Sequence, residues 1–302
     1  MCRLTRYGER PVAGFHPDRR NYIMRNTKTA ELVLTALFAA IIIIMAFTPL
    51  GYIPLVIINA TIIHIPVILG SLFCGPKKGA FLGFIFGLTS FIKNTVMPTS
   101  LSAFVFSPVL AASMVGTSGI FKSAFICFVP RILVGVIPYF VYIGIKKAVT
   151  SEKKTLWSTV FNLLIGLFLI FGVRAFILKV FEGKAVSAPV VLLISFAVGV
   201  IVFAALELFT LKKSGNISAF IYAGVTGAMV NTILVMGGIF VLYKEAYAKA
   251  LSIDPGTVLG TIGGVISFNG VIEAIVAAII VAALGVVLNK IKPIGQKTEK
   301  TA

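Results

Sequence analysis

The stretch INATIIHIPVILGSLFCGPKKGAFLGFIFGLTSFI, residues 58–92, contains two apolar runs separated by the sequence GPKK. Gly and Pro end one run and begin the next, and the two lysines make the turn polar. Glycine then recurs every four residues, at Gly75, Gly79, Gly83 and Gly87. This spacing places the glycines along one helix face, where a neighbouring membrane helix can approach closely. The stretch therefore predicts two antiparallel apolar helices, the second packed tightly on a neighbour.

The composition of the whole chain places these helices in a membrane. Of 302 residues, 58% are hydrophobic and 12% are charged, whereas soluble domains average about 45–50% and about 25%. At about 20 residues per crossing, the apolar runs supply about eight spans. We predict them over 30–50, 54–74, 79–95, 118–145, 155–179, 188–211, 217–243 and 257–288. The predicted fold is an all-α polytopic membrane protein, which excludes a soluble enzyme, a secreted disulfide scaffold and a nucleic-acid-binding domain.

Two segments are not predicted to cross the membrane. Residues 97–117 are apolar but interrupted by Pro98, Pro108 and several Ser and Gly, which favours a long loop packed on the protein; a re-entrant segment is the alternative. Residues 1–27 contain no apolar run and are rich in Arg. We expect them to form a disordered cytoplasmic arm or to precede the natural start of the chain.

Basic residues are distributed unevenly between the two ends of the spans. With the amino end taken as inside, the inner segments hold 19 of the 27 Lys and Arg residues, and the outer segments hold six. Cytoplasmic loops of membrane proteins carry such an excess. Both termini are therefore predicted to be cytoplasmic.

Ten polar residues within the predicted spans are candidates for function, because polar groups are costly at membrane depth. They are Asn59, Thr61, His64, Arg131, Arg174, Glu207, Asn231, Thr232, Asn269 and Glu273. Asn269 and Glu273 are four residues apart and share a face of the last helix. Arg131 follows Pro130 and precedes Gly135 and Pro138, so its helix is expected to be kinked and to have a carbonyl nearby without its usual donor.

These features predict a polar pocket between the fourth, seventh and eighth spans, lined by Arg131, Asn231, Asn269 and Glu273. A structural role is the alternative for several candidates. Arg131 and Glu273 could form a buried ion pair, and His64 could be a hydrogen-bonded interior histidine. Arg174 and Glu207 could hold two helices together.

Other chemistry is not indicated. The chain has no P-loop nucleotide motif, no GxSxG and no HExxH. The three cysteines and two histidines lack the spacing of metal ligands. We therefore expect no enzymatic activity, no metal and no cofactor of the chain's own.

Five stretches resemble the substrate-binding S components of energy-coupling factor (ECF) vitamin transporters, most of all the pantothenate-type members. They are TALFAAIIIIMAFTPLGYIP (35–54), INATIIHIPVILGSLFCGPKKGAFLGFIFGLTSFI (58–92), VPRILVGVIPYFVYIGIKK (129–147), GAMVNTILVMGGIF (227–240) and SFNGVIEAIVAAII (267–280). The resemblance covers residues 28–148 and 217–288. Its more specific phrases are HIP, GPKKGAFLG and the AxxxA pair Ala36 and Ala40.

The resemblance implies a protein of a prokaryotic cell membrane that binds a vitamin from outside. Such a subunit docks on a membrane T component carrying two ATPase subunits, which use the ATP, and topples in the bilayer to release the vitamin inside. Ala36 and Ala40 would contact the T component. Residues 49–54 and the loop 97–117 would form an outer lid.

If the vitamin is pantothenate, its carboxylate needs a cation, for which Arg131 and Lys93 are the candidates. Its hydroxyl and amide groups suit asparagine side chains, which both donate and accept. The predicted substrate-binding residues are Asn59, His64, Lys93, Arg131, Asn231, Asn269 and Glu273.

The chain departs from the six-helix S component in one place. Residues 149–216 add a predicted hairpin of two spans between core helices 1–4 (28–148) and core helices 5–6 (217–288). Two added crossings keep the topology of the later helices, and residues 289–302 form a cytoplasmic tail.

Two other functional classes remain open. A self-sufficient proton-coupled secondary transporter would use Glu273 as the proton carrier, and inverted repeats would favour it; none is evident in the sequence. A membrane enzyme acting on a lipid would need clustered acids or a placed nucleophile, which the isolated Glu207 and Glu273 do not provide.

Overall fold

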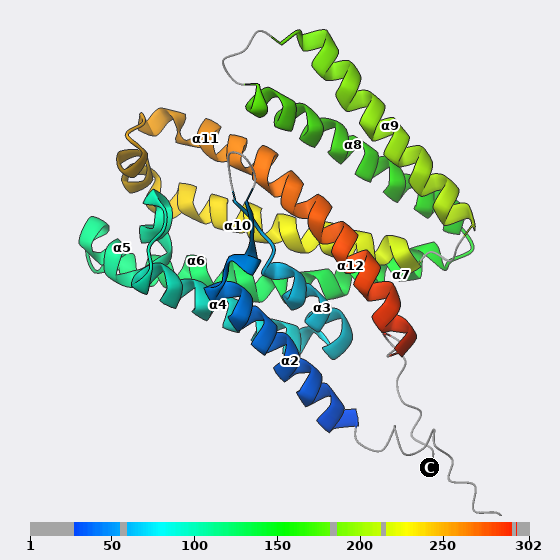
Figure 1. Ribbon diagram of the computed structural model, residues 1–302, viewed down its shortest axis with the longest axis horizontal. Coiled ribbons are helices and arrows are strands. Elements are labelled where there is room, and N and C mark those ends of the chain that lie inside the picture. The colour runs from blue at the N-terminus through cyan, green and yellow to red at the C-terminus, as the bar shows by residue number, and fades with distance from the viewer. Residues whose placement is uncertain (1–26, 55–58, 182–185, 213–215, 292–293, 295–302) are drawn as a thin grey trace, which may run out of the picture.

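The computed structural model describes residues 27–54, 59–181, 186–212, 216–291 and 294. Its long helices lie side by side in a bundle (Figure 1), and seven helical segments of the described chain are long and apolar enough to cross a membrane. Its α-helices are α2 (Thr27–Phe47), α3 (His64–Cys74), α4 (Pro76–Val96), α5 (Pro108–Val115), α6 (Ser118–Val134), α7 (Ile137–Val149), α8 (Lys154–Val180), α9 (Ala188–Lys212), α10 (Asn216–Leu251), α11 (Val258–Val265) and α12 (Val271–Ile291). The predicted all-α polytopic fold is confirmed.

The predicted span over residues 54–74 is wrong in its first half. That part contributes to an antiparallel hairpin of two short strands, β1 (Tyr52–Pro54) and β2 (Asn59–Thr61). The next helix, α3, has 11 residues, fewer than the about 20 that span a bilayer. The reason is local, since the sequence from Ile53 to Ile63 is rich in β-branched residues, which favour strands. Pro66 is tolerated because it lies in the first turn of α3, where N–H groups have no intrahelical acceptor.

Residues 97–117 do not form a spanning helix, as predicted, but they are not irregular throughout. They contain the 3₁₀ helix η2 (Leu101–Phe106) and the eight-residue α5, each short. Ser107 caps α5 through a side chain that accepts a hydrogen bond from the Leu110 N–H, and Pro108 occupies the first turn. The segment packs on α4 and α6 and so covers one end of the bundle.

The glycines of α4 pack against α6, as the four-residue spacing predicted. A Cβ on Gly79 would lie 2.0 Å from the Gly135 carbonyl oxygen, and one on Gly83 would lie 2.1 Å from that of Arg131. The fourth glycine, Gly75, lies in the turn before α4 with φ of +89°, a conformation that glycine adopts without strain. The two helices therefore approach to backbone contact in antiparallel register.

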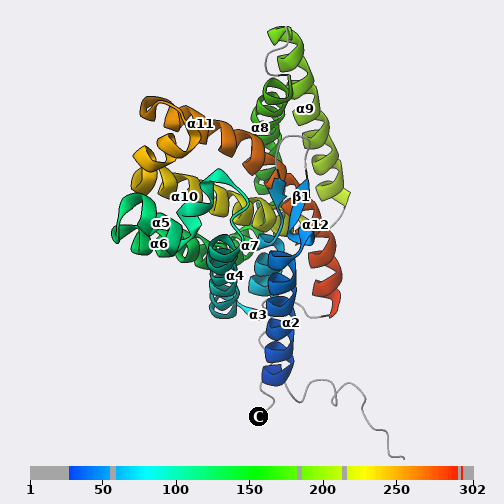
Figure 2. The same ribbon diagram turned by 60° about the vertical axis from the view of Figure 1, so that its left-hand side comes forward.

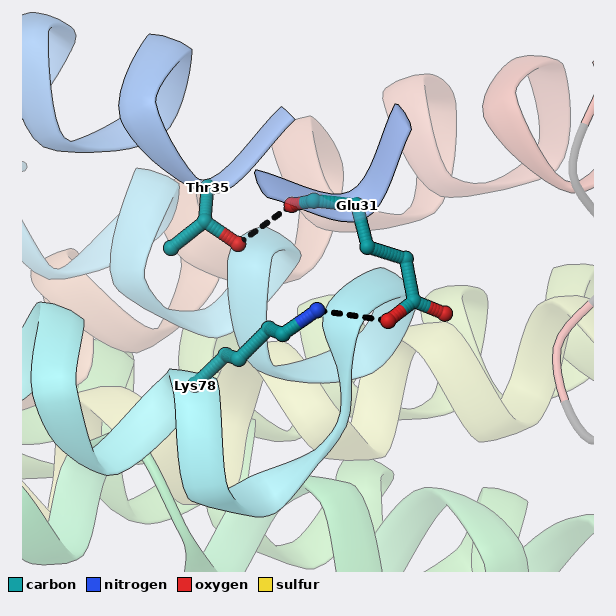
Figure 3. A network of polar contacts seen from close by, with 3 residues as sticks. All are labelled: Glu31, Thr35 and Lys78. Atoms are coloured by element: carbon teal, nitrogen blue, oxygen red, sulfur yellow. Dashed lines mark hydrogen bonds and ion pairs between the residues drawn. The ribbon is translucent and has the colours of Figure 1, made fainter. Parts of the chain in front are cut away.

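The start of the first described helix and the end of the last one identify the inner end of the bundle. The start of α2 and the end of α12 lie at the same end, which we call the inner end (Figure 1). Lys146, at the end of α7, donates a hydrogen bond to the Ile294 carbonyl there. Lys78, at the start of α4, forms an ion pair with Glu31 of α2 (Figure 3). Lysines thus gather at the end that the sequence predicts to be cytoplasmic.

The last third of the chain contains an unusual helix. The 36-residue α10 runs from the inner to the outer end, and a 3₁₀ turn, η3 (Pro255–Thr257), leads into α11. Between α11 and α12 lies a π-helical turn, η4 (Ile266–Gly270), within a segment that the sequence predicted to be a uniform span. α10 and α12 then pack antiparallel, with Gly224 against the backbone of Ala277.

The segment 149–216 contains α8 and α9, two antiparallel helices at the edge of the bundle. Both views show α8 between α9 and the remaining helices (Figure 1, Figure 2). Gly166 of α8 packs against Gly199 of α9. α8 in turn packs on α7, η4 and α12. Large apolar side chains of α9, such as Leu193, are exposed, as expected of a helix that faces lipid.

Candidate functional site

Glu273 is the centre of a buried hydrogen-bonded group at the outer end of α12. Its side chain is buried in the first turn of that helix. The backbone N–H of Thr61 in β2 donates to Glu273 Oε1 at 2.8 Å, and the hydroxyl of Thr232 in α10 donates to Oε2 at 3.0 Å. One carboxyl group therefore links the outer hairpin to two membrane helices.

His64 and Asn231 lie at one level on neighbouring helices. Ile68 of α3 packs on Gly227 of α10, where an added Cβ would be 2.3 Å from Ile68 Cδ1. His64 and Asn231 lie one turn outward of this contact on the two antiparallel helices. Both nitrogens of the fully buried His64 and the Oδ1 of buried Asn231 have no hydrogen-bond partner in the described structure. Such buried polar atoms are normally satisfied, so a ligand or water is expected among them.

Asn269 lies within the π-helical turn η4, just before Glu273. The helix that carries both residues is therefore not a regular α-helix throughout, because Asn269 lies in the π turn and Glu273 in the α-helical part that follows. η4 packs closely on α10: a Cβ on Gly270 would lie 3.2 Å from Thr232 Cγ2. Asn269 Oδ1 is a further buried oxygen without a partner in the described chain.

Arg131 occupies the special position that Pro130 creates. Pro130 lies inside α6 and has no N–H, so the carbonyl of Ile126, four residues earlier, loses its helical donor. Arg131 Nη1 donates to that carbonyl at 2.5 Å. The predicted free carbonyl is thus found, and the helix breaks between α6 and α7 at Gly135 and Val136, within the stretch where a kink was predicted.

The guanidinium of Arg131 also packs against aromatic rings. Its centre lies 5.4 Å from the ring of Phe86 in α4 and 5.0 Å from that of Phe106 in η2, distances typical of cation–π contacts. The hydrogen bonds of Glu273, by contrast, come from Thr61 and Thr232. Glu273 is thus bonded by two threonines, while Arg131 bonds the Ile126 carbonyl.

Two segments at the outer end of the bundle, the β1–β2 hairpin and η2, each contact one charged residue. The β1–β2 hairpin contacts Glu273 through Thr61, and η2 contacts Arg131 through Phe106. The sequence pattern identified Arg131 and Glu273 but not the groups that contact them. A backbone N–H, such as that of Thr61, is present in almost every residue and so cannot be singled out from the sequence. The β-branched residues before α3 were the available signal for the hairpin.

Two predicted residues lie further out. Asn59 is in β2, two residues before Thr61, but its side chain lies outside the described part of the structure. Lys93 is half-buried in the last turn of α4. Gly83 of the same helix packs on the Arg131 backbone. Lys93 lies ten residues further outward, a distance of about 15 Å along the helix. Lys93 therefore lies toward the outer surface relative to buried Arg131.

Glu207 belongs to a separate polar group between α8 and α9. Its carboxylate accepts hydrogen bonds from the Thr159 hydroxyl at 2.5 Å and from Asn162 Nδ2 at 2.7 Å. Arg174 is exposed on α8. Glu207 therefore holds the two helices together, and the structural alternative for it is favoured. Among the residues that the structure describes, no three His, Cys, Asp or Glu side chains are placed to hold a metal ion.

Ala36 and Ala40 lie on an open face of α2. Both are exposed, together with Val33 and Leu37 on the same side of the helix. The opposite side is held by buried contacts with α3 and α4 and, at the inner end, by the Glu31–Lys78 ion pair at 2.5 Å (Figure 3). The small residues are thus available to a neighbouring helix.

Comparison with known proteins identifies the family. A sequence profile described as "ECF transporter, substrate-specific component" matches residues 30–207, more than half of the chain. A pantothenic acid transporter PanT from Lactococcus lactis subsp. cremoris is 41% identical over 128 residues, 39% of this chain and 61% of that protein. A pantothenate transporter PanT from Leuconostoc mesenteroides subsp. mesenteroides is 37% identical over 119 residues, 38% of this chain and 51% of that protein.

The chain thus spans less than two thirds of the length of either relative. The resemblance to pantothenate-type S components predicted from the sequence is confirmed by these matches. Together with the seven apolar helices, they indicate a multi-pass protein of a prokaryotic plasma membrane. The chain belongs to the family of substrate-specific components of ECF transporters.

Proposed function

We propose that this chain is the subunit of an ECF-type importer that captures pantothenate outside the cell. The observation that carries the proposal is a set of polar residues on neighbouring helices, in a chain similar to two pantothenate transporters. We call His64, Arg131, Asn231, Asn269 and Glu273 the cluster; the β1–β2 hairpin contacts its Glu273 and η2 contacts its Arg131. A ligand of this kind has one carboxylate, one amide and two hydroxyl groups. The cluster offers one cation and several unpartnered acceptors and nitrogens, which matches that mixture.

Arg131 is proposed to bind the carboxylate, because charge-assisted hydrogen bonds to a guanidinium are the strongest available here. Asn231 and Asn269 are proposed to bind the hydroxyl and amide groups, since each has a buried Oδ1 awaiting a donor. His64, with two unpartnered nitrogens, is proposed to complete the contacts. Lys93 is assigned to the outer entrance, where it would attract the anion.

Glu273 is proposed to hold the outer lid as well as to face the ligand. Its bond from the Thr61 N–H joins the hairpin to the helices, so closing of the hairpin would be favoured by this contact. Asn59, two residues away in β2, is proposed to approach the ligand when the hairpin is closed.

Delivery inside is proposed to depend on partner subunits. The open face of α2 around Ala36 and Ala40 suits close packing against helices of a T component. Two ATPase subunits would use the ATP, and the chain itself would carry no cofactor.

A proton-coupled secondary transporter is the alternative, favoured by the single observation that Glu273 is a buried carboxyl group at membrane depth. The two functions differ in their energy source. Liposomes that contain this chain alone, or this chain with a T component and two ATPases, would be loaded with ATP and tested for uptake of radiolabelled pantothenate.

The proposal expects ATP-dependent uptake in the complete complex and none by the chain alone under a proton gradient. Proton-driven uptake by the chain alone would contradict it. In that case Glu273→Gln would abolish uptake, because an amide cannot carry the proton.

A further inference from the structure

Helix α8 contacts the substrate-side end of the last helix at two places. The ring of Phe176 stacks on that of Phe268 in η4, with centroids 5.2 Å apart and planes 4° from parallel. One turn further in, Gly172 packs on Val271, where an added Cβ would lie 2.2 Å from Val271 Cγ1. Phe268 is 3% exposed and Phe176 is 40% exposed, so the Phe176 ring covers the buried Phe268 from the side of α8.

The two contacts lie on either side of Asn269. Phe268 precedes it and Val271 comes two residues after it, at the start of the helix that carries Glu273. At this level of the bundle α8 packs on η4 and on α12.

A π-helical turn is a rare conformation, found mostly as a single turn within α-helices, so we expect it to depend on its surroundings more than an α-helix does. The helix before it, α11, contains Gly260, Gly263 and Gly264, each in open space. Glycine lowers intrinsic helix stability by about 1 kcal/mol relative to alanine. The conformation of η4 is therefore weakly specified by its own sequence and is fixed by the helices that pack on it.

Helix α8 is itself anchored on the helices of the core. The Tyr222 hydroxyl of α10 donates to the Phe161 carbonyl of α8, and the two rings lie 5.2 Å apart. This contact lies about four turns inward of Phe176. α8 is thus attached at both an inner and an outer level and can serve as a fixed support.

We infer that Gly172 and Phe176 of α8 are positioning residues for substrate binding, which hold the π-helical turn so that Asn269 points at the ligand. The inference rests on the proposed function, because it assigns Asn269 to the ligand. It gives the α8–α9 hairpin a part in recognition that is distinct from membrane anchoring.

The test is a double-mutant comparison of pantothenate affinity in the purified chain. Phe176→Ala is expected to weaken binding about three- to tenfold, the effect of losing one aromatic pair. Phe176→Tyr keeps the stack and is expected to retain the affinity of the parent. Phe171→Ala is the matched control, since Phe171 is on the same helix but 69% exposed.

Asn269→Ala separates positioning from general destabilisation. If Phe176 acts through Asn269, then Phe176→Ala has little further effect in the Asn269→Ala background, because coupled residues are not additive. Equal losses in both backgrounds, or equal effects of Phe176→Ala and Phe171→Ala, would overturn the inference. Phe176→Leu, which keeps apolar volume but not the stack, replaces Phe176→Ala if that variant does not fold.

The failure of this inference is distinguishable from failure of the proposed function. If the unmodified chain binds no pantothenate, the proposed function fails. If it binds pantothenate and the variants behave additively, the function stands and the support by α8 is wrong.

Discussion

Arg131 illustrates how one side chain can serve the fold and a ligand together. Its Nη1 satisfies the Ile126 carbonyl that Pro130 leaves without a donor, and its ring contacts tie α6 to α4 and η2. A guanidinium has five N–H donors, so a bond to one carbonyl does not exhaust them. The structural role and the proposed binding role are compatible.

The two roles can be separated by restoring the missing donor. Pro130→Ala supplies an N–H for the Ile126 carbonyl, so Arg131→Gln in that background no longer leaves the carbonyl unsatisfied. We predict that pantothenate affinity still falls by about 10- to 100-fold, from the loss of one charged hydrogen bond. Equilibrium binding of the two variants measures this.

Lys93→Gln removes the other candidate cation, and its loss of pantothenate affinity is to be compared with that of Arg131→Gln. A smaller loss than for Arg131→Gln is expected, because Lys93 lies about 15 Å of helix further out. A larger loss would move the anion site to the outer end of α4.

The hydrogen bonds of Glu273 make a second residue-level prediction. Thr232→Val removes the hydroxyl that donates to Oε2 and is predicted to speed pantothenate release about tenfold, from the loss of a bond to a carboxylate. Glu273→Gln keeps an amide oxygen that accepts from the Thr61 N–H, and its NH₂ group can donate to the Thr232 hydroxyl. The release rate of this variant should therefore stay near that of the parent.

Stopped-flow or filter-binding dissociation rates provide the measurement. If Glu273→Gln releases the ligand faster than Thr232→Val does, the complex is held together by the charge of Glu273 rather than by its hydrogen bonding.

At this scale the sequence predicts the candidate residues better than their contacts. Polar groups within apolar runs stand out, which is why Arg131, Asn231 and Glu273 were identified. The Thr61 N–H was not, because the hairpin that presents it depends on pairing between segments. The bonding of Glu273 by Thr232 depends likewise on tertiary packing.

At the scale of elements, apolar length alone misjudged the segment before α3. Residues 54–74 have the composition of a span, yet their β-branched first half pairs as strands. The π-helical turn was also not predictable, since it arises where α8 and α10 pack on η4. The glycine spacing of α4, by contrast, predicted its packing because it depends on helix geometry alone.

The close packing of α4 on α6 gives a prediction about stability. Gly79→Ala places a methyl group 2.0 Å from the Gly135 carbonyl oxygen, so the backbones must separate, at a cost of about 1–3 kcal/mol. We predict a lower midpoint of thermal unfolding in detergent.

Gly144→Ala in α7 is the control, because an added Cβ there meets nothing within 4 Å. Its unfolding midpoint should be unchanged or higher, since alanine favours helix by about 1 kcal/mol. Equal destabilisation by both variants would argue against a backbone contact between α4 and α6.

For the whole molecule, α8 and α9 lie at one edge of the bundle (Figure 2), while the exposed face of α2 bears Ala36 and Ala40. Lysines mark the inner end, where Lys78 and Lys146 make their contacts. The number and direction of most spans could be predicted, because both depend on length and charge. Their arrangement in space depends on packing and could not.

The open face of α2 makes a prediction about assembly. Ala36→Leu with Ala40→Leu would block close approach of a partner helix. We predict at least tenfold less co-purification with the T component and ATPases, with pantothenate binding to the isolated chain retained. Ala197→Leu, an exposed position on α9, is the control and should leave assembly intact; equal effects of both changes would contradict docking through α2.

The central claim, that this chain binds pantothenate by itself, is tested most directly by equilibrium binding of radiolabelled pantothenate to the purified chain in detergent, without nucleotide or partner subunits. The account predicts saturable binding of one ligand per chain, competed by unlabelled pantothenate and weakened by Arg131→Gln. A folded chain that shows no saturable binding, or binding that Arg131→Gln leaves unchanged, would contradict it.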